Sequence, residues 1–168
     1  MINEDRYSFR PAEKYELDIV FDLISIRIKW MDSMGINQWN KVDYWHFYPK
    51  EYFIKACNEK RLFVLYDTET EYIVAIGVLS SSDKRWIDNK KAIYLHNFVT
   101  VLDRPGVGSI FLDLCEKYAL SLNIDDVRLD CKKSNDKLNK YYEDKGYELV
   151  DVVVDGEYVG NKREKNLR

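Results

Sequence analysis

Hydrophobic positions near the start of the chain recur every three or four residues, which is the spacing of a helix with one buried face. Residues 20–34 follow this pattern and stop before Gly35, and residues 49–59 follow it again. Ahead of both segments, apolar and polar residues alternate over positions 7–10 and end at Pro11. The pattern therefore predicts a short edge strand followed by two helices.

From residue 61 onward the hydrophobic pattern is that of strands. Positions 62–66 and 72–79 are rich in β-branched and aromatic residues and flank a polar turn at 67–70, which predicts a hairpin. Positions 92–101 are apolar on both faces. A strand of this kind is typical of the middle of a sheet that is covered on both sides.

The last part of the pattern alternates between helix and strand. A glycine-containing turn at 106–109 leads into a helix over 110–122, followed by a strand at 127–131, a helix over 135–142 and a strand at 147–154. The whole order is strand, two helices, three strands, helix, strand, helix, strand. It predicts an α/β fold with a mixed sheet and helices on both faces.

The composition is that of a globular domain: 168 residues, 46% hydrophobic and 33% charged, with a formal net charge of −3. We expect one domain over residues 1–160 and a frayed, charged tail over 161–168. No apolar stretch approaches the ~20 residues of a membrane-spanning helix, and the start lacks a signal-peptide core, so we expect a cytoplasmic protein without a membrane partner. No basic stripe favours nucleic acid, and both a monomer and a homodimer remain open.

The cysteines and histidines do not suggest a metal centre. Cys57, Cys115 and Cys131 form no CxxC pair, and His46 and His96 are the only histidines. We therefore predict no metal. Cys131 has no evident histidine partner, so the sequence does not favour it as a nucleophile either.

The turn Gly106-Val107-Gly108-Ser109 follows the predicted central strand and opens a helix. Glycines at such a turn let the backbone approach a ligand, and the free N–H groups of a helix start favour an anion such as pyrophosphate. The same glycines also suit a tight turn with no ligand. A nucleotide P-loop is disfavoured because Ser109 and Ile110 follow Gly108 where that motif requires Lys-Ser or Lys-Thr.

In this arrangement the chain resembles the GNAT superfamily of acyl-CoA N-acyltransferases. The resemblance is carried by residues 94–100 (YLHNFVT), the turn at 106–109, residues 128–131 (RLDC), Asn135, and residues 141–147 (YYEDKGY). It extends to residues 34–39 (MGINQW), which are similar to a stretch of some small bacterial members. It implies a splayed sheet and acetyl-CoA (coenzyme A) as co-substrate.

The resemblance also implies which residues contact coenzyme A. The pantetheine arm would bind the backbone of Val99, Thr100 and Val101. The pyrophosphate would bind Arg104, Pro105, Gly106, Val107, Gly108 and Ser109. Asn135 is similar to the family's asparagine in the cofactor site, and Lys137 and Lys140 would assist at the 3′-phosphate.

The implied reaction is direct attack of an amine on the acetyl thioester, with a backbone N–H near Val99 polarising the carbonyl. Tyr142 matches the family's tyrosine that contacts coenzyme A and gives a proton to the leaving thiolate; packing against the sheet is the alternative role. For the base, His96 is our candidate because imidazole suits proton transfer near neutral pH. Asp130 is a second candidate, and a packed, purely structural His96 remains open.

The aromatic segment between the first two predicted helices contains Trp39, Tyr44 and Trp45, which we expect to bind the acceptor. Aromatic faces beside Asp43 suit a cationic amine, although core packing explains the same residues. We expect acetyl transfer to the primary amine of a small molecule. The alternatives are a protein or RNA-bound amine, and a non-catalytic acyl-CoA-binding module, which Asp103 in the phosphate loop keeps open because the family usually has Gln or Arg there.

Overall fold

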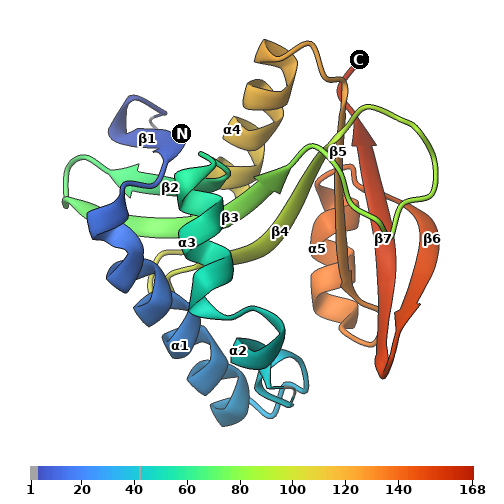
Figure 1. Ribbon diagram of the computed structural model, residues 1–168, viewed down its shortest axis with the longest axis horizontal. Coiled ribbons are helices and arrows are strands. Elements are labelled where there is room, and N and C mark those ends of the chain that lie inside the picture. The colour runs from blue at the N-terminus through green and yellow to red at the C-terminus, as the bar shows by residue number, and fades with distance from the viewer. Residues whose placement is uncertain (1–3, 42) are drawn as a thin grey trace. The chain divides into compact units, whose positions relative to one another are not determined.

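The computed structural model describes residues 4–41 and 43–168, and it divides into two compact units. The first unit comprises the residues up to Val78 together with Asn97–Leu112, and the second comprises Leu79–His96 and Asp113–Arg168. Strand β4 (Ile93–Thr100) runs through both units, so each unit contains part of it. The elements are labelled in Figure 1.

The first unit contains the edge strand, the helices and the hairpin that the sequence predicts. Its elements are β1 (Tyr7–Pro11), α1 (Leu17–Ser33), α2 (Tyr44–Phe47), α3 (Lys50–Asn58), β2 (Leu62–Asp67) and β3 (Tyr72–Ser80), with short 3-10 turns at Glu4–Arg6, Lys14–Glu16 and Trp39–Lys41. Strand β2 pairs antiparallel with both β1 and β3. Helix α1 ends where predicted, because Gly35 adopts a positive φ of 66°.

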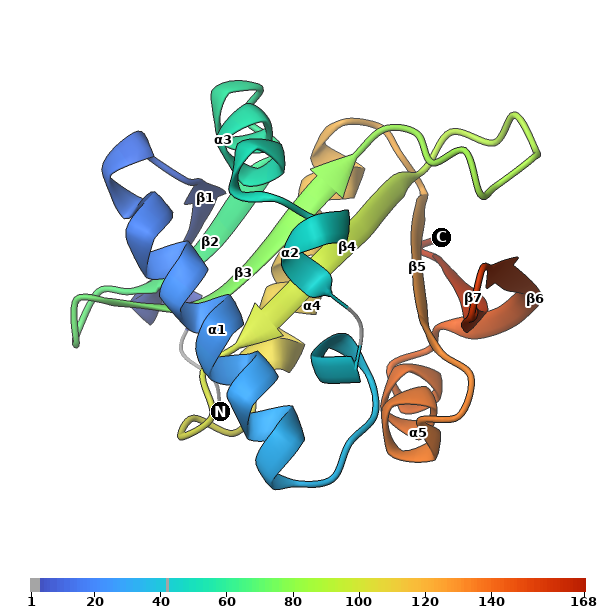
Figure 2. The same cartoon turned by 60° about the horizontal axis from the view of Figure 1, so that its bottom comes forward.

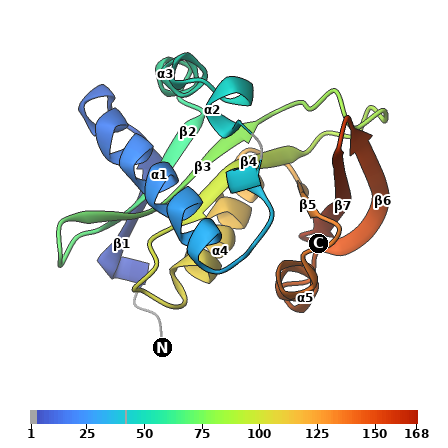
Figure 3. The same cartoon turned by 90° about the horizontal axis from the view of Figure 1, so that it is seen from below.

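Helices α1 and α3 lie on one face of the first unit's strands, as Figures 2 and 3 show. The core on this face contains Val20 and Ile24 of α1, Phe53 of α3, Leu62 of β2 and Ile76 of β3, all fully buried. The apolar positions that recur at helical spacing in the sequence are therefore the ones that the sheet covers.

The opposite face of these strands packs against the start of α4 (Val107–Ser121) through aromatic rings. Phe111 of α4 stacks on Phe98 of β4 with ring centroids 4.8 Å apart and meets Phe9 of β1 edge-on at 5.1 Å. Both faces of these strands are thus covered, which explains why β2, β3 and β4 contain runs of consecutive apolar residues.

The second unit contains β5 (Asp126–Lys132), α5 (Asp136–Asp144), β6 (Glu148–Asp155) and β7 (Tyr158–Asn166). The strand β7 pairs antiparallel with β5 on one side and with β6 on the other. Strand β5 runs parallel to β4, but their ladder has only two pairs, Ile93 with Val127 and Tyr94 with Arg128. A ladder this short agrees with the splayed sheet that the family resemblance implies.

Together the strands form a seven-stranded mixed sheet in the order β1-β2-β3-β4-β5-β7-β6. The predicted α/β class with helices on both faces is confirmed. Among the residues that the structure describes, no helix combines the length and hydrophobicity needed to cross a bilayer.

The prediction of a frayed tail over 161–168 is wrong. Residues 161–166 belong to β7, and Asn161, Lys162 and Arg163 are buried. Their donor groups find partners inside the unit: Arg163 donates to the carbonyl of Tyr147 at 2.9 Å, and the Asn161 amide donates to Asn139 at 2.7 Å, whereas Asn161 Oδ1 accepts no hydrogen bond from the described residues. Charged residues thus form an interior strand because hydrogen-bond partners from α5 and its flanks surround it.

Candidate functional site

The phosphate loop predicted at 106–109 has the expected local geometry. Strand β4 ends at Thr100, Gly106 adopts a φ of 94°, and α4 begins at Val107. A Cβ at Gly106 would meet no atom within 4 Å, so the glycine is required by its backbone conformation and the space beside it is open. The N–H groups of Ser109 and Ile110 already donate to the Gly106 carbonyl at 3.1 and 3.2 Å, so the donors that this helix start offers an anion are those of Val107 and Gly108.

The end of β4 is held by contacts that the sequence did not predict. Arg27 of α1 donates to the Thr100 carbonyl at 2.6 Å and to its hydroxyl at 3.0 Å, and the Val101 N–H donates to the Val74 carbonyl at 2.9 Å. Of the three predicted pantetheine contacts, the Thr100 carbonyl and the Val101 N–H are therefore engaged within the protein. Arg27 looked like an ordinary surface residue of the predicted helix, so no sequence signal identified it.

The side chain of Arg104, in the predicted phosphate loop, is bound to Asp67. Arg104 contacts the Oδ2 of this fully buried carboxylate, while Arg6 donates to both of its oxygens at 2.8 and 2.5 Å. The hydrogen bonds from Arg6 hold the pKa of Asp67 well below its usual range, although burial opposes this shift. Asp67, which the sequence placed in a hairpin turn, is thus an anchor for the loop, whereas Asp103 is exposed.

The three predicted acceptor residues line one pocket of about 250 Å³ in the first unit. Trp39 and Tyr44 have ring centroids 4.8 Å apart, and Tyr44 meets Trp45 edge-on at 5.6 Å. Tyr44 also belongs to the core, so the packing role and the pocket role coincide in this residue. The complete lining is Ser25, Ile28, Lys29, Trp39, Asp43, Tyr44 and Trp45.

Asn97 connects the pocket wall to β4. It adopts a φ of 52° in the middle of the strand, a left-handed conformation that asparagine tolerates better than most residues. Its amide donates to the Tyr44 hydroxyl at 2.8 Å and accepts from the Tyr52 hydroxyl at 3.0 Å. These two hydrogen bonds could not be predicted from the sequence, because the tyrosines lie 45 and 53 positions from Asn97.

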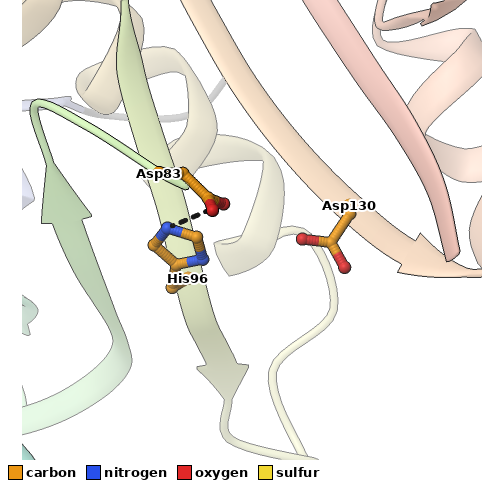
Figure 4. A group of neighbouring side chains, drawn as sticks. All are labelled: Asp83, His96 and Asp130. Carbon is orange, nitrogen blue, oxygen red and sulfur yellow. Dashed lines mark ion pairs between the residues drawn. The ribbon is translucent and has the colours of Figure 1, made fainter. Parts of the chain in front are cut away.

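In the second unit, the predicted base His96 lies beside Asp83, which follows β3. The distance from His96 Nε2 to Asp83 Oδ2 is 3.6 Å (Figure 4). The other carboxylate oxygen of Asp83 accepts the backbone N–H of Arg85 at 2.8 Å. No sequence pattern pointed to Asp83, so this pairing was not predicted.

The alternative base, Asp130, is occupied by other groups. The Tyr158 hydroxyl donates to its Oδ2 at 2.6 Å, and the Arg85 guanidinium lies 3.5 Å from the same oxygen. One ligand atom each from Asp83, His96 and Asp130 lie within 4.8 Å of one another. Arg85 is also 3.7 Å from Asp83, so one guanidinium lies between the two carboxylates.

Tyr142, the predicted proton donor, lies on α5 and is buried. Its ring meets that of Tyr147 edge-on with centroids 5.9 Å apart, so it does pack within the unit. Burial, assisted by neighbouring Cys131 and Asp130, raises the pKa of Tyr142 far above that of free tyrosine. The phenol therefore keeps its proton at neutral pH. Burial likewise raises the pKa of the Cys131 thiol to about 11, which agrees with excluding it as a nucleophile.

The remaining predicted cofactor residues lie at the start of α5. Asn135 caps this helix by accepting the Leu138 N–H at 3.1 Å, and Lys137 is exposed in the first turn. A cavity of about 510 Å³ lies beside them, lined by Lys132, Lys133, Ser134, Glu157 and Val159. Asn139, which the sequence did not single out, accepts from Asn161 and Arg163 and donates to the Lys132 carbonyl, so it organises the segment that leads into α5.

Comparison with known proteins identifies the class of fold. No protein-family model matches the sequence, and no curated protein does. Among solved structures, the chain is similar to a GNAT-family acetyltransferase from Listeria monocytogenes, with a TM-score of 0.78 and 19% identity over 96% of this chain and 95% of that chain. It is also similar to the PaiA N-acetyltransferase of Thermoplasma acidophilum in complex with coenzyme A (TM-score 0.69, 18% identity, covering 95% and 98%).

A third similar structure is a spermidine N-acetyltransferase from Vibrio cholerae, with a TM-score of 0.65 and 13% identity over 97% of this chain and 95% of that chain. These matches span nearly the whole length of each chain. The chain therefore has the fold of the GNAT acetyltransferases, as its motifs predicted.

Proposed function

We propose that the chain is an acyl-CoA-dependent N-acetyltransferase that transfers the acetyl group of acetyl-CoA to the primary amine of a small molecule. The observation that carries this proposal is the turn from β4 through Gly106 into α4. This turn has both backbone N–H donors and open space beside Gly106. One of the solved structures with this fold is a complex with coenzyme A, which supports the assignment.

The loop of the first unit suits a pyrophosphate even though it offers few unpaired basic side chains. Arg104 is paired with Asp67, so the amides of the loop, rather than its side chains, supply most of the donors. The pantetheine contacts are assigned to Val99 and to the groups of Thr100 and Val101 that are not engaged with Arg27 and Val74. In the second unit, Asn135 and Lys137 are assigned to the adenosine end of the ligand.

The chemistry assigned to the chain is proton transfer on both sides of a direct displacement. Acetyl-CoA supplies a thioester whose C–S bond breaks, the pair of electrons leaving with sulfur, as the amine nitrogen bonds to the acetyl carbon. Tyr142, a protonated phenol, gives its proton to the sulfur, and His96 accepts the proton that the amine loses. No covalent intermediate on the protein is required.

The acceptor is assigned to the aromatic pocket of the first unit. Trp39, Tyr44 and Trp45 provide aromatic rings that suit a cationic amine, and Asp43 provides a carboxylate for it beside the positive charge of Lys29. The similar spermidine N-acetyltransferase acts on an amine of this class, which supports the same assignment here. The amine must lose a proton to bond to the acetyl carbon. His96 is therefore assigned to the transfer step rather than to binding of the amine.

The test combines binding with turnover. Calorimetric titration of the purified chain with acetyl-CoA is expected to show one site, and thiol release with a panel of polyamines, amino acids and peptides is expected to identify a small amine. Tyr142→Phe should keep binding and lose most of the thiol release. Binding without release over the whole panel would indicate a non-catalytic acyl-CoA-binding module, and no binding at millimolar acetyl-CoA would refute the proposal.

A further inference from the structure

Asp83 is a buried carboxylate with one satisfied oxygen and one unsatisfied oxygen. Its side chain is 6% exposed; Oδ1 accepts the Arg85 N–H, whereas Oδ2 is buried and accepts no hydrogen bond from any described residue. A buried carboxylate oxygen without a donor is costly, so such atoms nearly always face one. The group that Oδ2 faces is the Nε2 of His96, at 3.6 Å.

We propose that Asp83 is the positioning residue of His96: it fixes the imidazole with its proton on Nε2, so that Nδ1 is the nitrogen that accepts the proton of the amine. The role of His96 toward an amine rests on the proposed function, whereas the position of the proton on its ring does not. The two ring nitrogens are distinct, and the hydrogen bond made by one determines which of them is basic. Figure 4 shows the second nitrogen on the side of the ring that faces Asp130.

The distance of 3.6 Å is too long for a hydrogen bond in the structure as it stands. Hydrogen bonds of catalytic groups commonly tighten when substrate binds, so we expect this distance to shorten in the complex. Asp83 is itself held in place on its other side, because Oδ1 is bound to the Arg85 backbone. The imidazole is therefore the partner that is expected to move.

Asp130 is less suited to this role than Asp83. Its Oδ2 accepts the Tyr158 hydroxyl and lies 3.5 Å from Arg85, so this oxygen is already engaged. Arg85 is in turn held by Lys162, which donates to its backbone carbonyl at 3.1 Å.

The charges around the ring also favour a base. Asp83 and Asp130 contribute two negative charges and Arg85 one positive charge, so the cluster carries one net negative charge before His96 gains a proton. Protonation of the imidazole brings the cluster to neutrality. The charge that develops on His96 as it takes the amine proton is therefore stabilised where it forms.

The first experiment reads the tautomer directly and does not depend on turnover. The chain has two histidines, so a long-range ¹H–¹⁵N spectrum contains two imidazoles, and His46→Gln assigns them. We expect His96 to be protonated on Nε2. In Asp83→Asn the side-chain amide donates to Nε2 and the proton moves to Nδ1, whereas Asp83→Ala gives a mixture. Asp88→Asn, in the same loop but bound to Arg128, is the matched control and should leave the spectrum unchanged.

The second experiment measures acetyl transfer. Asp83→Asn is expected to lower kcat by about tenfold or more while leaving the KM for acetyl-CoA unchanged, and His96→Gln should lower kcat by about a hundredfold. Asp88→Asn should change neither constant. An Nε2-protonated His96 in Asp83→Asn, or full turnover by that variant, overturns the proposal. If the wild-type chain transfers no acetyl group, the proposed function fails, but the tautomer experiment still decides the role of Asp83.

Discussion

Two buried aspartates, Asp67 in the first unit and Asp83 in the second, show how the same residue type serves different ends. Asp67 is surrounded by Arg6, Arg104 and the backbone N–H groups of Glu69 and Thr70, at 3.0 and 3.4 Å, so both of its oxygens are satisfied. Asp83 is satisfied on one oxygen and faces an imidazole with the other. A carboxylate whose two oxygens both accept hydrogen bonds holds the structure together. A carboxylate with one oxygen left over can still bind and orient a neighbouring group.

The sharpest test of this contrast replaces each aspartate by asparagine and measures stability. Asp67→Asn removes the charge that two arginines share, and because those arginines are partly exposed we expect a loss of about 2 to 3 kcal/mol, at or below the lower end of the range for fully buried pairs. Asp83→Asn should cost less than about 1 kcal/mol, since Oδ2 gives up no hydrogen bond. Urea denaturation measures both, and equal losses would contradict the comparison.

Acid titration separates the two roles in a second way. The folded pKa of Asp67 is below its unfolded value of about 3.9, so its contribution to stability is complete above that value and is lost as pH falls through the folded pKa. The wild-type chain should therefore lose stability on acidification below about pH 4. Asp67→Asn should show a shallower acid slope between pH 4 and 2, measured by urea unfolding at each pH, and an unchanged slope would argue against the assignment.

The third prediction concerns the two arginines of Asp67. Arg104→Gln loosens the phosphate loop, so we expect acetyl-CoA to bind about tenfold more weakly, equivalent to about 1.4 kcal/mol. Arg6→Gln removes a contact to the same carboxylate from outside the loop. It should lower stability to a similar extent but leave the Kd for acetyl-CoA unchanged in calorimetry. Equal Kd changes in the two variants would show that Asp67 does not act through the loop.

The smallest expected effect comes from making Asp130 resemble Asp83. Tyr158→Phe removes the 2.6 Å hydrogen bond to Asp130 Oδ2, at a cost of about 1 kcal/mol. The freed oxygen then becomes a second acceptor near His96, and the histidine spectrum is expected to show a less uniform tautomer. A spectrum identical to that of the wild type would mean that Tyr158 plays no part in directing Asp130.

The fold could be predicted where the buried residues are apolar. It could not be predicted where apolar residues are exposed or charged residues are buried. The strand β6 has exposed apolar residues, with Leu149 55% and Val154 70% accessible, because it is the last strand of the sheet. The strand β7 is charged, yet it lies between β5 and β6 with Arg163 and Lys162 buried. The hydrophobic pattern identified β6 and overlooked β7, since only the folded unit supplies the partners that make a buried arginine acceptable.

The candidate site divides in the same manner. The glycine turn, the aromatic pocket residues and Tyr142 were marked by local sequence, because turn chemistry and aromatic density are visible in a short window. Asp67 with Arg6 and Asp83 with His96 were not, because each pair joins positions 61 or 13 apart and an isolated aspartate in a loop looks like any solvated one. Electrostatic pairing at long sequence separation is a property of the tertiary structure alone.

Gly160 has a consequence for how this chain varies through evolution. A Cβ at this position would lie 2.6 Å from the ring of Tyr158, so the tyrosine reaches Asp130 only across a residue that has no side chain. A side chain at position 160 would displace the Tyr158 ring, so we expect a chain that replaces this glycine to lose the hydrogen bond that holds Asp130 as well.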